Sequence, residues 1–257
     1  YASLKAATGS VASLYFGEPS SELDILAVTG TNGKTSTAWW LAVALSGLDA
    51  DLAIPCGLVG TLGAGRPPAL MATGMTTPDP VLLQRQFRGF VDQGLQACAI
   101  EASSIGLAER RLDGTRVRVA VFTNFTHDHL DYHGTMQAYW RAKAALFAWP
   151  GLKAAVVNLD DPMAPEVLSI LSSRDIETWT YSLRGSGRLQ ARDVHFSGAG
   201  LSFTVIEAGV AIPMQTRLVG QFNVSNVLGV IGAMRAMDVP LARAIEACSK
   251  LSPVPGR

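Results

Sequence analysis

The sequence predicts an α/β fold in which a mostly parallel sheet of the P-loop type is flanked by helices. Short apolar runs of strand length alternate with longer segments of helical spacing, a pattern typical of parallel sheets. A glycine-rich loop at residues 30–35 joins the first of these runs to a helical segment. Near residues 189–219, apolar and polar residues alternate around glycine turns, which predicts a small antiparallel β patch attached to the main sheet.

The composition is that of a globular protein without an excess of either charge. Of its 257 residues, 48% are hydrophobic and 16% are charged, with 21 basic and 21 acidic side chains. This balance gives no electrostatic footprint for nucleic acid or a membrane surface, and no apolar stretch reaches the roughly 18–20 residues of a membrane span. The three cysteines lie far apart, as expected for reduced thiols. We therefore expect a cytoplasmic monomer that binds no nucleic acid and is not inserted in a membrane.

The hydrophobic spacing predicts each element in turn along the chain. The predicted helices cover residues 1–15, 34–46, 80–93, 136–148, 224–237 and 241–251. The predicted strands of the main sheet cover residues 25–29, 52–55, 97–100, 117–125 and 154–157. Residues 57–80 are rich in Gly, Pro and Thr, and we expect a long loop with little regular structure there.

The loop Gly30-Thr31-Asn32-Gly33-Lys34-Thr35 has the features of a phosphate cradle. It follows the apolar run 25–28 and opens a helix, so backbone N–H groups and the helix N-terminus can face an anion. In such loops the lysine reaches the terminal phosphates and the following hydroxyl holds Mg²⁺. Val28 stands where the common pattern has its first glycine, so this is a shortened variant. A glycine-rich turn with an exposed lysine is the alternative.

Polar residues also follow two further predicted strands, at the sheet edge where parallel strands place their ligands. Glu101 ends one strand, and three histidines and two aspartates at residues 127–133 follow another. Beside a Lys-Thr loop, Glu101 is expected to bind Mg²⁺; the alternative is a cap for a helix that starts near Ser103. For the histidine cluster we favour one imidazole in a Mg²⁺–nucleotide site. The alternatives are a zinc site, whose usual spacing is missing, and a polar loop capped by aspartates.

Lys143 lies on the apolar face of its predicted helix. Its neighbours three and four positions away are Tyr139, Trp140, Leu146 and Phe147, which share that face. A buried lysine has a lowered pKa, because burial disfavours the charged form. The alternative is a lysine that extends past the aromatic residues into water.

Two further polar motifs allow a binding or a capping interpretation. Thr76-Thr77-Pro78-Asp79 lies in the expected loop, where its side chains could bind a polar substrate or cap the next helix. Asn223 and Asn226 could contact a base through their amides or cap the helix predicted from Val224. The residues alone leave both pairs of alternatives open.

Taken together, these motifs resemble the central ATPase domain of the Mur ligases, and within that family the type that forms the UDP-N-acetylmuramoyl tripeptide. The matching segments span nearly the whole chain in order: residues 29–37, 76–78, 101–104, 123–134, 139–147, 220–226 and 255–257. The resemblance implies a central ATP-binding domain at residues 25–252. It also implies that residues 1–24 and 253–257 are linkers to N-terminal and C-terminal domains that this chain lacks. We therefore expect binding of ATP and Mg²⁺ but little ligation by these residues alone.

The resemblance also implies roles for the candidate residues. The ATP phosphates would be bound by Gly30, Thr31, Asn32, Gly33, Lys34, Thr35, Ser36 and Arg257, and the adenine by Asn223 and Asn226. Two Mg²⁺ ions would be held, one by Thr35 and Glu101, the other by His129 and a CO₂-derived carbamate on Lys143. The UDP-muramoyl-peptide would contact Thr76, Thr77, Ser103 and Arg111. Lys34, His129 and Lys143 would be the catalytic residues.

The implied reaction is an ATP-dependent ligation in peptidoglycan synthesis. ATP phosphorylates the terminal carboxylate of UDP-N-acetylmuramoyl-L-alanyl-D-glutamate to an acyl phosphate. The amine of an amino acid, expected to be a diamino acid, then displaces the phosphate. Three positions depart from the family pattern: Met75 replaces an Asn, Ile105 a His and Glu109 a Gln. A folylpolyglutamate synthetase-like ligase and a non-catalytic nucleotide-binding module are the alternatives.

Overall fold

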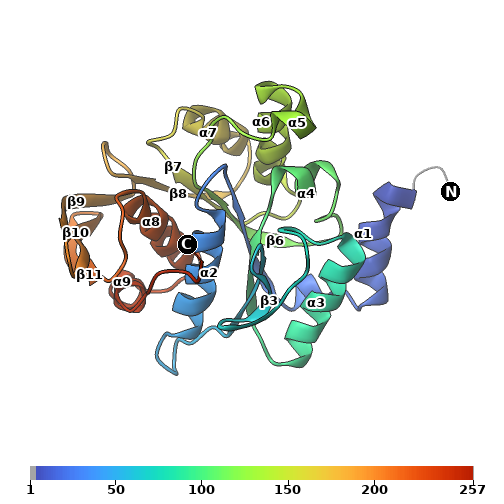
Figure 1. Cartoon of the computed structure of the whole chain (residues 1–257), viewed down its shortest axis with the longest axis horizontal. Helices are drawn as coiled ribbons and strands as arrows, with labels where there is room; N and C mark the ends of the chain where they lie inside the picture. Colours follow the sequence, from blue (N-terminus) through green and yellow to red (C-terminus); the bar gives the residue numbers. More distant parts are fainter. Residues whose placement is uncertain (1–3, 257) are drawn as a thin grey trace.

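The strand that precedes the glycine-rich loop, β1 (Asp24–Thr29), lies near the middle of the sheet. In this computed structural model, which describes residues 4–256, it pairs in parallel with β5 (Ala97–Glu101) and β6 (Val117–Phe122). Residues 25–28 are fully buried, because helices cover both faces of the sheet (Figure 1). A strand covered on both faces needs a continuous apolar run, so no alternation marks it in the sequence.

The described part of the chain forms one eleven-stranded sheet in the order β11-β10-β9-β8-β7-β6-β1-β5-β2-β3-β4. Its parallel part also contains β2 (Cys56–Gly60), β7 (Ala154–Asn158), β8 (Glu177–Ser182) and β9 (Leu189–Ser197). Antiparallel strands extend both edges: β3 (Gly63–Arg66) and β4 (Ala69–Met71) at one, β10 (Gly200–Glu207) and β11 (Val210–Thr216) at the other. The predicted fold class and the antiparallel patch are confirmed.

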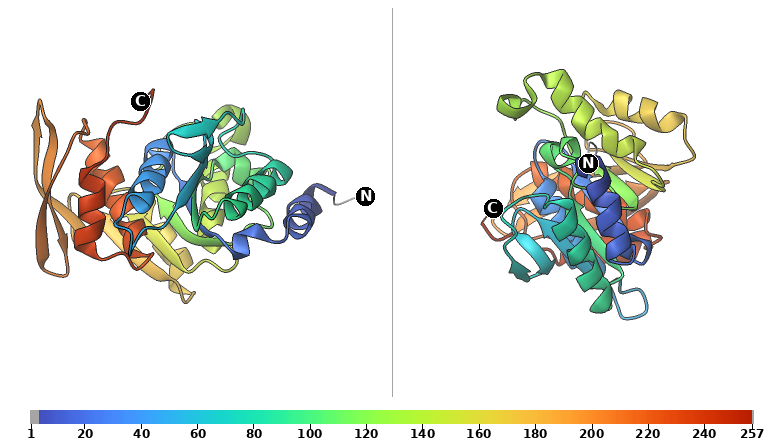
Figure 2. Two further views of the ribbon diagram at one scale, coloured as in Figure 1. Left: turned by 90° about the horizontal axis from the view of Figure 1, so that it is seen from below. Right: turned by 90° about the vertical axis from the view of Figure 1, so that its right-hand side faces the viewer.

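Helices pack on both faces of this sheet (Figures 1 and 2). One face carries α2 (Lys34–Ser46), α8 (Phe222–Arg235) and α9 (Leu241–Ser249). The other carries α3 (Pro80–Asp92), α4 (Ser104–Ala108), α6 (Met136–Ala144) and α7 (Ala164–Ser172), with α1 (Leu4–Tyr15) against α3. The short turns are η1 (Pro19–Ser21), α5 (Leu130–His133) and η2 (Ala145–Ala148). Within residues 4–256, no helix is both long and apolar enough to cross a membrane.

The strand predicted at residues 52–55 is wrong. The strand of this region, β2, begins at Cys56. The N–H of Ile54 donates to the carbonyl of Leu45, at 3.1 Å, which holds the preceding segment against the end of α2 instead of the sheet. An apolar run that returns along a helix end cannot be told from a short strand by its composition.

The irregular loop predicted at residues 57–80 is also wrong, because this segment contains most of β2 and all of β3 and β4. Its glycines reflect close packing. A Cβ on Gly57 would lie 2.8 Å from the ring of Phe90, and one on Gly65 would lie 2.4 Å from the carbonyl oxygen of Ala69. The glycines of this segment therefore reflect the close approach of neighbouring groups in strands, although the sequence had suggested a loop.

Elsewhere the predicted boundaries shift by a few residues. The strand predicted at 117–125 ends at Phe122, after which the N–H of Thr31 donates to the carbonyl of Asn124, at 2.8 Å, and joins this segment to the glycine loop. The helix predicted at 136–148 changes to a 3-10 turn at Ala145. Strand β8 and helix α7 were not predicted. The first residues of the helix predicted at 1–15 and Arg257 lie outside the described residues.

Candidate active site

Two glycines shape the loop between β1 and α2. Gly30 and Gly33 have φ values of +150° and +83°, which residues other than glycine rarely adopt. A Cβ on Gly30 would lie 1.9 Å from Oγ1 of Thr123, and one on Gly33 would lie 2.5 Å from Oδ1 of Asn226. The backbone of the loop therefore runs directly against the segments after β6 and at the start of α8, and α2 begins at Lys34.

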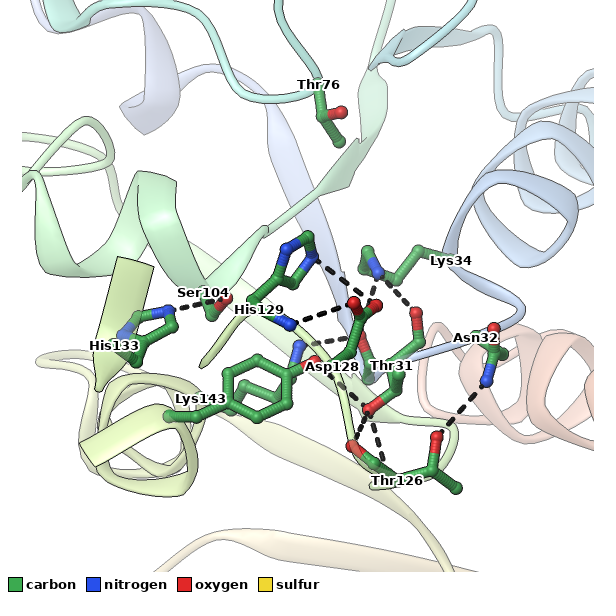
Figure 3. A network of polar contacts seen from close by, with 12 residues as sticks. Thr31, Asn32, Lys34, Thr76, Ser104, Thr126, Asp128, His129, His133 and Lys143 are labelled. Atoms are coloured by element: carbon green, nitrogen blue, oxygen red, sulfur yellow. Dashed lines mark hydrogen bonds and ion pairs between the residues drawn. The ribbon is translucent and has the colours of Figure 1, made fainter. Parts of the chain in front are cut away.

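The side chain of Lys34 folds back over this loop. Its Nζ donates to the carbonyl oxygens of Gly30 and Thr31, each at 2.8 Å. Lys143 reaches the same place from α6, and its Nζ donates to the Gly30 carbonyl at 2.6 Å. Two lysine side chains from helices on opposite faces of the sheet thus meet at the carboxyl end of β1 (Figure 3).

Lys143 is fully buried, as its apolar face predicted, and the alternative of a side chain extended into water is wrong. Its Nζ lies 4.7 Å from the centre of the Tyr139 ring. Burial, followed by the nearby charge of Lys34, lowers the pKa of Lys143 to about 6, while Asp128 opposes this shift. The amine is therefore largely neutral at neutral pH, and a neutral amine is a nucleophile.

Glu101 brings a buried carboxylate to the adjacent strand end. It is 1% exposed, and its Oε2 accepts a hydrogen bond from Oγ1 of Thr35 at 2.9 Å. Helix α4 is capped by Ser103, whose Oγ accepts the N–H of Gly106 at 3.0 Å, so the alternative that Glu101 caps it is wrong. A carboxylate and a hydroxyl side by side are hard oxygen donors, which fits Mg²⁺, an ion that leaves most of its coordination to phosphate and water.

Two side chains of the histidine cluster, His129 and His133, point in different directions (Figure 3). His129, with a φ of +50°, faces the space beside Lys34, and its Nε2 lies 3.6 Å from Oδ2 of Asp128. His133 points away and shares a hydrogen bond with Oγ of Ser104 at 3.0 Å. Among the described residues no group of three or more His, Cys, Asp or Glu could hold a metal ion.

Two clefts meet at the glycine loop, and Asn32 and Gly33 line both. The first cleft has a volume of about 380 Å³. Lys34 lines one side of it, and Thr76 faces it from the other side (Figure 3). It brings together nearly all candidate residues for the metal and the substrate: Thr35, Thr76, Thr77, Glu101, Ser103, Arg111 and His129. The predicted convergence on one edge of the sheet is thereby confirmed.

Thr77 and Arg111 form hydrogen bonds within the wall of this cleft. The hydroxyl of Thr77 donates to the carbonyl of Glu101 at 2.6 Å, and Nη1 of Arg111 donates to the carbonyl of Thr77 at 3.0 Å. Asp79 accepts hydrogen bonds from the N–H groups of residues 81 and 82 and caps α3. Within this motif, Asp79 therefore caps the helix, whereas Thr76 and Thr77 line the cleft.

The second cleft, of about 660 Å³, lies on the other side of the loop, against α8. Its walls include Ser36, Phe222, Asn223 and Asn226. The amides of the two asparagines bond to each other, Nδ2 of Asn226 to Oδ1 of Asn223 at 3.2 Å. Neither caps α8, because its N-cap residue is Gln221, so the capping alternative is wrong.

Three site residues were missed in the sequence. Oδ1 of Asn124 accepts the N–H of Asn32 at 2.9 Å, and its position after a strand, like that of Glu101, was a usable signal. Tyr139 is fully buried, and its hydroxyl shares a hydrogen bond with Oγ1 of Thr31 at 3.1 Å. Thr61 contacts the Glu101 carboxylate through its N–H at 2.7 Å. The helix face that Tyr139 shares with Lys143 predicted its burial but not this hydrogen bond, and Thr61 had no signal beyond residue type.

The departures from the family pattern lie in two places. Met75 and Ile105 line the smaller cleft directly. Glu109 instead bonds to Lys5 and to the hydroxyl of Tyr132, and these hydrogen bonds lower its pKa. Glu109 thus ties α1 to the turn that carries His129.

A glycine loop that opens a helix, with a buried carboxylate and a hydroxyl beside it, defines a P-loop-type nucleotide-binding protein. Within this class, the Mur ligase middle domain is the family that matches the chain, over residues 28–234. The chain belongs to the Mur ligase family.

Several curated relatives that match share one name. The UDP-N-acetylmuramoyl-L-alanyl-D-glutamate--2,6-diaminopimelate ligase of Acidovorax sp. is 61% identical over 258 residues, which are 99% of this chain and 51% of that protein. Its counterpart in Pseudomonas aeruginosa is 41% identical over 255 residues, again 99% and 51%. The chain thus spans about half the length of these relatives.

Solved structures agree with the sequence match. A structure of UDP-N-acetylmuramoyl-L-alanyl-D-glutamate--2,6-diaminopimelate ligase superposes with a TM-score of 0.91 at 33% identity, over 99% of this chain and 52% of that one. MurF from Acinetobacter baumannii superposes with a TM-score of 0.77 at 19% identity, over 98% and 51%, a likeness of fold alone.

Proposed function

We propose that this chain is the central, ATP-binding part of a ligase that adds 2,6-diaminopimelate to UDP-N-acetylmuramoyl-L-alanyl-D-glutamate in peptidoglycan synthesis. The observation that carries the proposal is the meeting of Lys34, Lys143 and the Thr35–Glu101 pair around one glycine loop. The names of the relatives at 61% and 41% identity support the substrates. A cytoplasmic monomer remains our expectation.

The phosphate end of ATP would lie on the loop, residues 30–36, with its charge offset by Lys34 and the backbone N–H groups at the start of α2. Thr35 and Glu101 would hold one Mg²⁺, and His129 with Lys143 the second. Bound Mg²⁺ supplies charge stabilisation for the transferred phosphoryl group. The adenine would occupy the 660 Å³ cleft beside Asn223 and Asn226. Arg257, outside the described residues, would reach the phosphates.

Lys143 would serve as a carbamate. Its neutral amine attacks the carbon of CO₂, an N–C bond forms while one C=O electron pair moves to oxygen, and the nitrogen releases a proton to water. The product is an anionic group with two oxygen donors, a better Mg²⁺ ligand than an amine. Full burial and a pKa lowered to about 6 support this step, because the amine is available without deprotonation by a stronger base.

The smaller cleft would take the dipeptide end of the UDP-muramoyl substrate, at Thr76, Thr77, Ser103 and Arg111. The terminal carboxylate attacks the γ-phosphorus, ADP leaves, and the acyl phosphate forms. The incoming amine then attacks the acyl carbon and phosphate leaves. No protein nucleophile takes part. We further propose that the amine-binding pocket and the uridine site belong to domains outside residues 25–252.

A chimera tests this function. Residues 4–256 replace the corresponding half of the Acidovorax relative, which is 61% identical over this span. We expect the chimera to form the UDP-muramoyl tripeptide, ADP and phosphate, and Lys34→Ala to abolish all three products. Activity on folylpolyglutamate substrates in place of the muramoyl dipeptide would contradict the proposal, as would binding of ATP without any ligation by the chimera.

A further inference from the structure

Thr61, at the turn between β2 and β3, holds both oxygens of the Glu101 carboxylate. Its N–H donates to Oε1 at 2.7 Å, and its Oγ1 donates to Oε2 at 3.2 Å. Thr61 itself is exposed, whereas Glu101 is 1% exposed. An exposed residue at a turn thus determines the orientation of a buried carboxylate.

The turn is built close against that carboxylate. A Cβ on Gly60, the residue before Thr61, would lie 2.2 Å from Oε1 of Glu101. The absence of a side chain at residue 60 therefore lets the N–H of Thr61 approach within hydrogen-bonding distance. The arrangement is one of close backbone contact, which fixes the oxygen more firmly than a flexible side chain would.

The hydroxyl of Thr61 also reaches the substrate side of the cleft, where its Oγ1 lies 3.0 Å from Oγ1 of Thr76. An ionised carboxylate can only accept, so the single hydroxyl proton of Thr61 is directed at Glu101. The hydroxyl of Thr76 must then donate to Thr61. Its lone pairs are left to accept a hydrogen bond from an N–H or O–H group of a molecule in the cleft.

We propose that Thr61 is a positioning residue that couples the metal site at Glu101 to the substrate site at Thr76, an inference that rests on the proposed function. A cation bound at Glu101 would restrain the carboxylate, and through its two bonds from Thr61 it would restrain the Thr61 side chain. The restrained Thr61 hydroxyl would in turn hold the hydroxyl of Thr76 in one orientation. Binding of metal and nucleotide therefore favours binding of the dipeptide substrate, and the reverse.

The first measurement is Mn²⁺ affinity, by electron paramagnetic resonance, of the 257-residue chain with a non-hydrolysable ATP analogue. Thr61→Val removes the hydroxyl and keeps the N–H, so we expect Mn²⁺ affinity to fall about 10-fold, in the range typical of partners that orient metal ligands. Thr61→Ser restores the hydroxyl and should stay within about two-fold of the parent. Thr73→Val is the matched control, because Thr73 Oγ1 bonds only locally, to the Met75 carbonyl at 2.9 Å.

The second measurement is the dissociation constant of UDP-muramoyl-dipeptide for the chimeric ligase, with and without Mn²⁺ and the analogue. The chimera should bind the dipeptide more tightly in their presence, and Thr61→Val in the chimera should lose that difference. Unchanged Mn²⁺ affinity in Thr61→Val, with a melting temperature equal to that of the parent, overturns the proposal. If the chimera fails to bind the dipeptide, the substrate assignment and the coupling fall, while the Mn²⁺ affinities of the 257-residue chain still decide whether Thr61 positions Glu101.

Discussion

The side chains of Lys34 and Lys143 donate to one acceptor, the carbonyl oxygen of Gly30, at 2.8 and 2.6 Å. Two ammonium groups this close would repel each other, and only Lys143 is fully buried. Burial first, and the charge of Lys34 second, lower the pKa of Lys143 to about 6. Lys143 is therefore largely a neutral amine at neutral pH, beside the charge of Lys34.

Removing the charge of Lys34 should act on Lys143. In Lys34→Met the charge that helps to lower the pKa of Lys143 is gone, so this pKa should rise. ¹³C NMR with ¹³CO₂ follows the carbamate as a function of pH, and its midpoint should move to higher pH. Nucleotide affinity should also fall about 10- to 100-fold, since loss of a hydrogen bond to a charged group costs about 1.5–3 kcal/mol. Lys250→Met, at an exposed lysine paired with Glu246, is the control. A carbamate midpoint that stays in place would show that Lys34 does not influence Lys143.

The buried amine should also make stability depend on pH. Between about pH 6 and its ordinary pKa of 10.5, Lys143 binds a proton in the unfolded chain but not in the folded one. Stability therefore rises with pH across this window. Lys143→Met should remove this contribution between pH 6 and 8 and raise the free energy of unfolding at pH 7 by about 1–3 kcal/mol. Urea unfolding curves at several pH values measure both effects, and equal slopes in the two proteins would argue against a neutral Lys143.

The spacing of residues revealed the buried face of Lys143 but not its partner. Tyr139 and Phe147 share its helix face, so burial followed from local sequence. The acceptor, Gly30, lies 113 positions away in sequence and on another element. Only the strand order, with β1 beside β6, brings the two together, and strand order is not contained in hydrophobic spacing.

The glycine-rich region 57–80 illustrates a second limit. Glycine favours loops because it adopts positive φ, but it also permits close packing, and sequence does not distinguish the two. At Gly57 and Gly60 the neighbours are the Phe90 ring and the Glu101 carboxylate, each from a distant segment. The strand and the contacts of Thr61 were missed for this reason, whereas Glu101 itself was found because it ends a recognisable buried strand.

The carbamate itself can be tested by chemical rescue. In the chimeric ligase, Lys143→Ala should lose turnover, because the proposed second metal site would lose the oxygen donors of the proposed carbamate. Small carboxylates such as formate or acetate fit the space left by the side chain and should restore part of the rate. The readout is phosphate release against carboxylate concentration. Lys34→Ala is the comparison, since a missing cation cannot be replaced by an anion. Loss of turnover without rescue would leave Lys143 as a structural amine and remove the carbamate from the mechanism.

The close contact between the glycine loop and α8 can be separated from the backbone requirement at Gly33. Gly33 and Gly94 have φ values of +83° and +74°, so alanine at either position should cost about 1–2 kcal/mol of stability through backbone strain. They differ in their surroundings. A Cβ on Gly33 would lie 2.5 Å from Oδ1 of Asn226, whereas a Cβ on Gly94 would have no heavy atom within 4 Å. Gly33→Ala should therefore displace Asn226 from the wall of the larger cleft.

Calorimetry with an ATP analogue and thermal unfolding measure the two effects separately. Both alanine variants should melt at similar, lowered temperatures, because the backbone penalty is common to them. Only Gly33→Ala should lose nucleotide affinity, since only there does the new methyl group meet a residue of the proposed adenine site. If Gly94→Ala weakened nucleotide binding equally, the loss would follow from general destabilisation. If Gly33→Ala bound the analogue as tightly as the parent, Asn226 would have no part in holding the nucleotide.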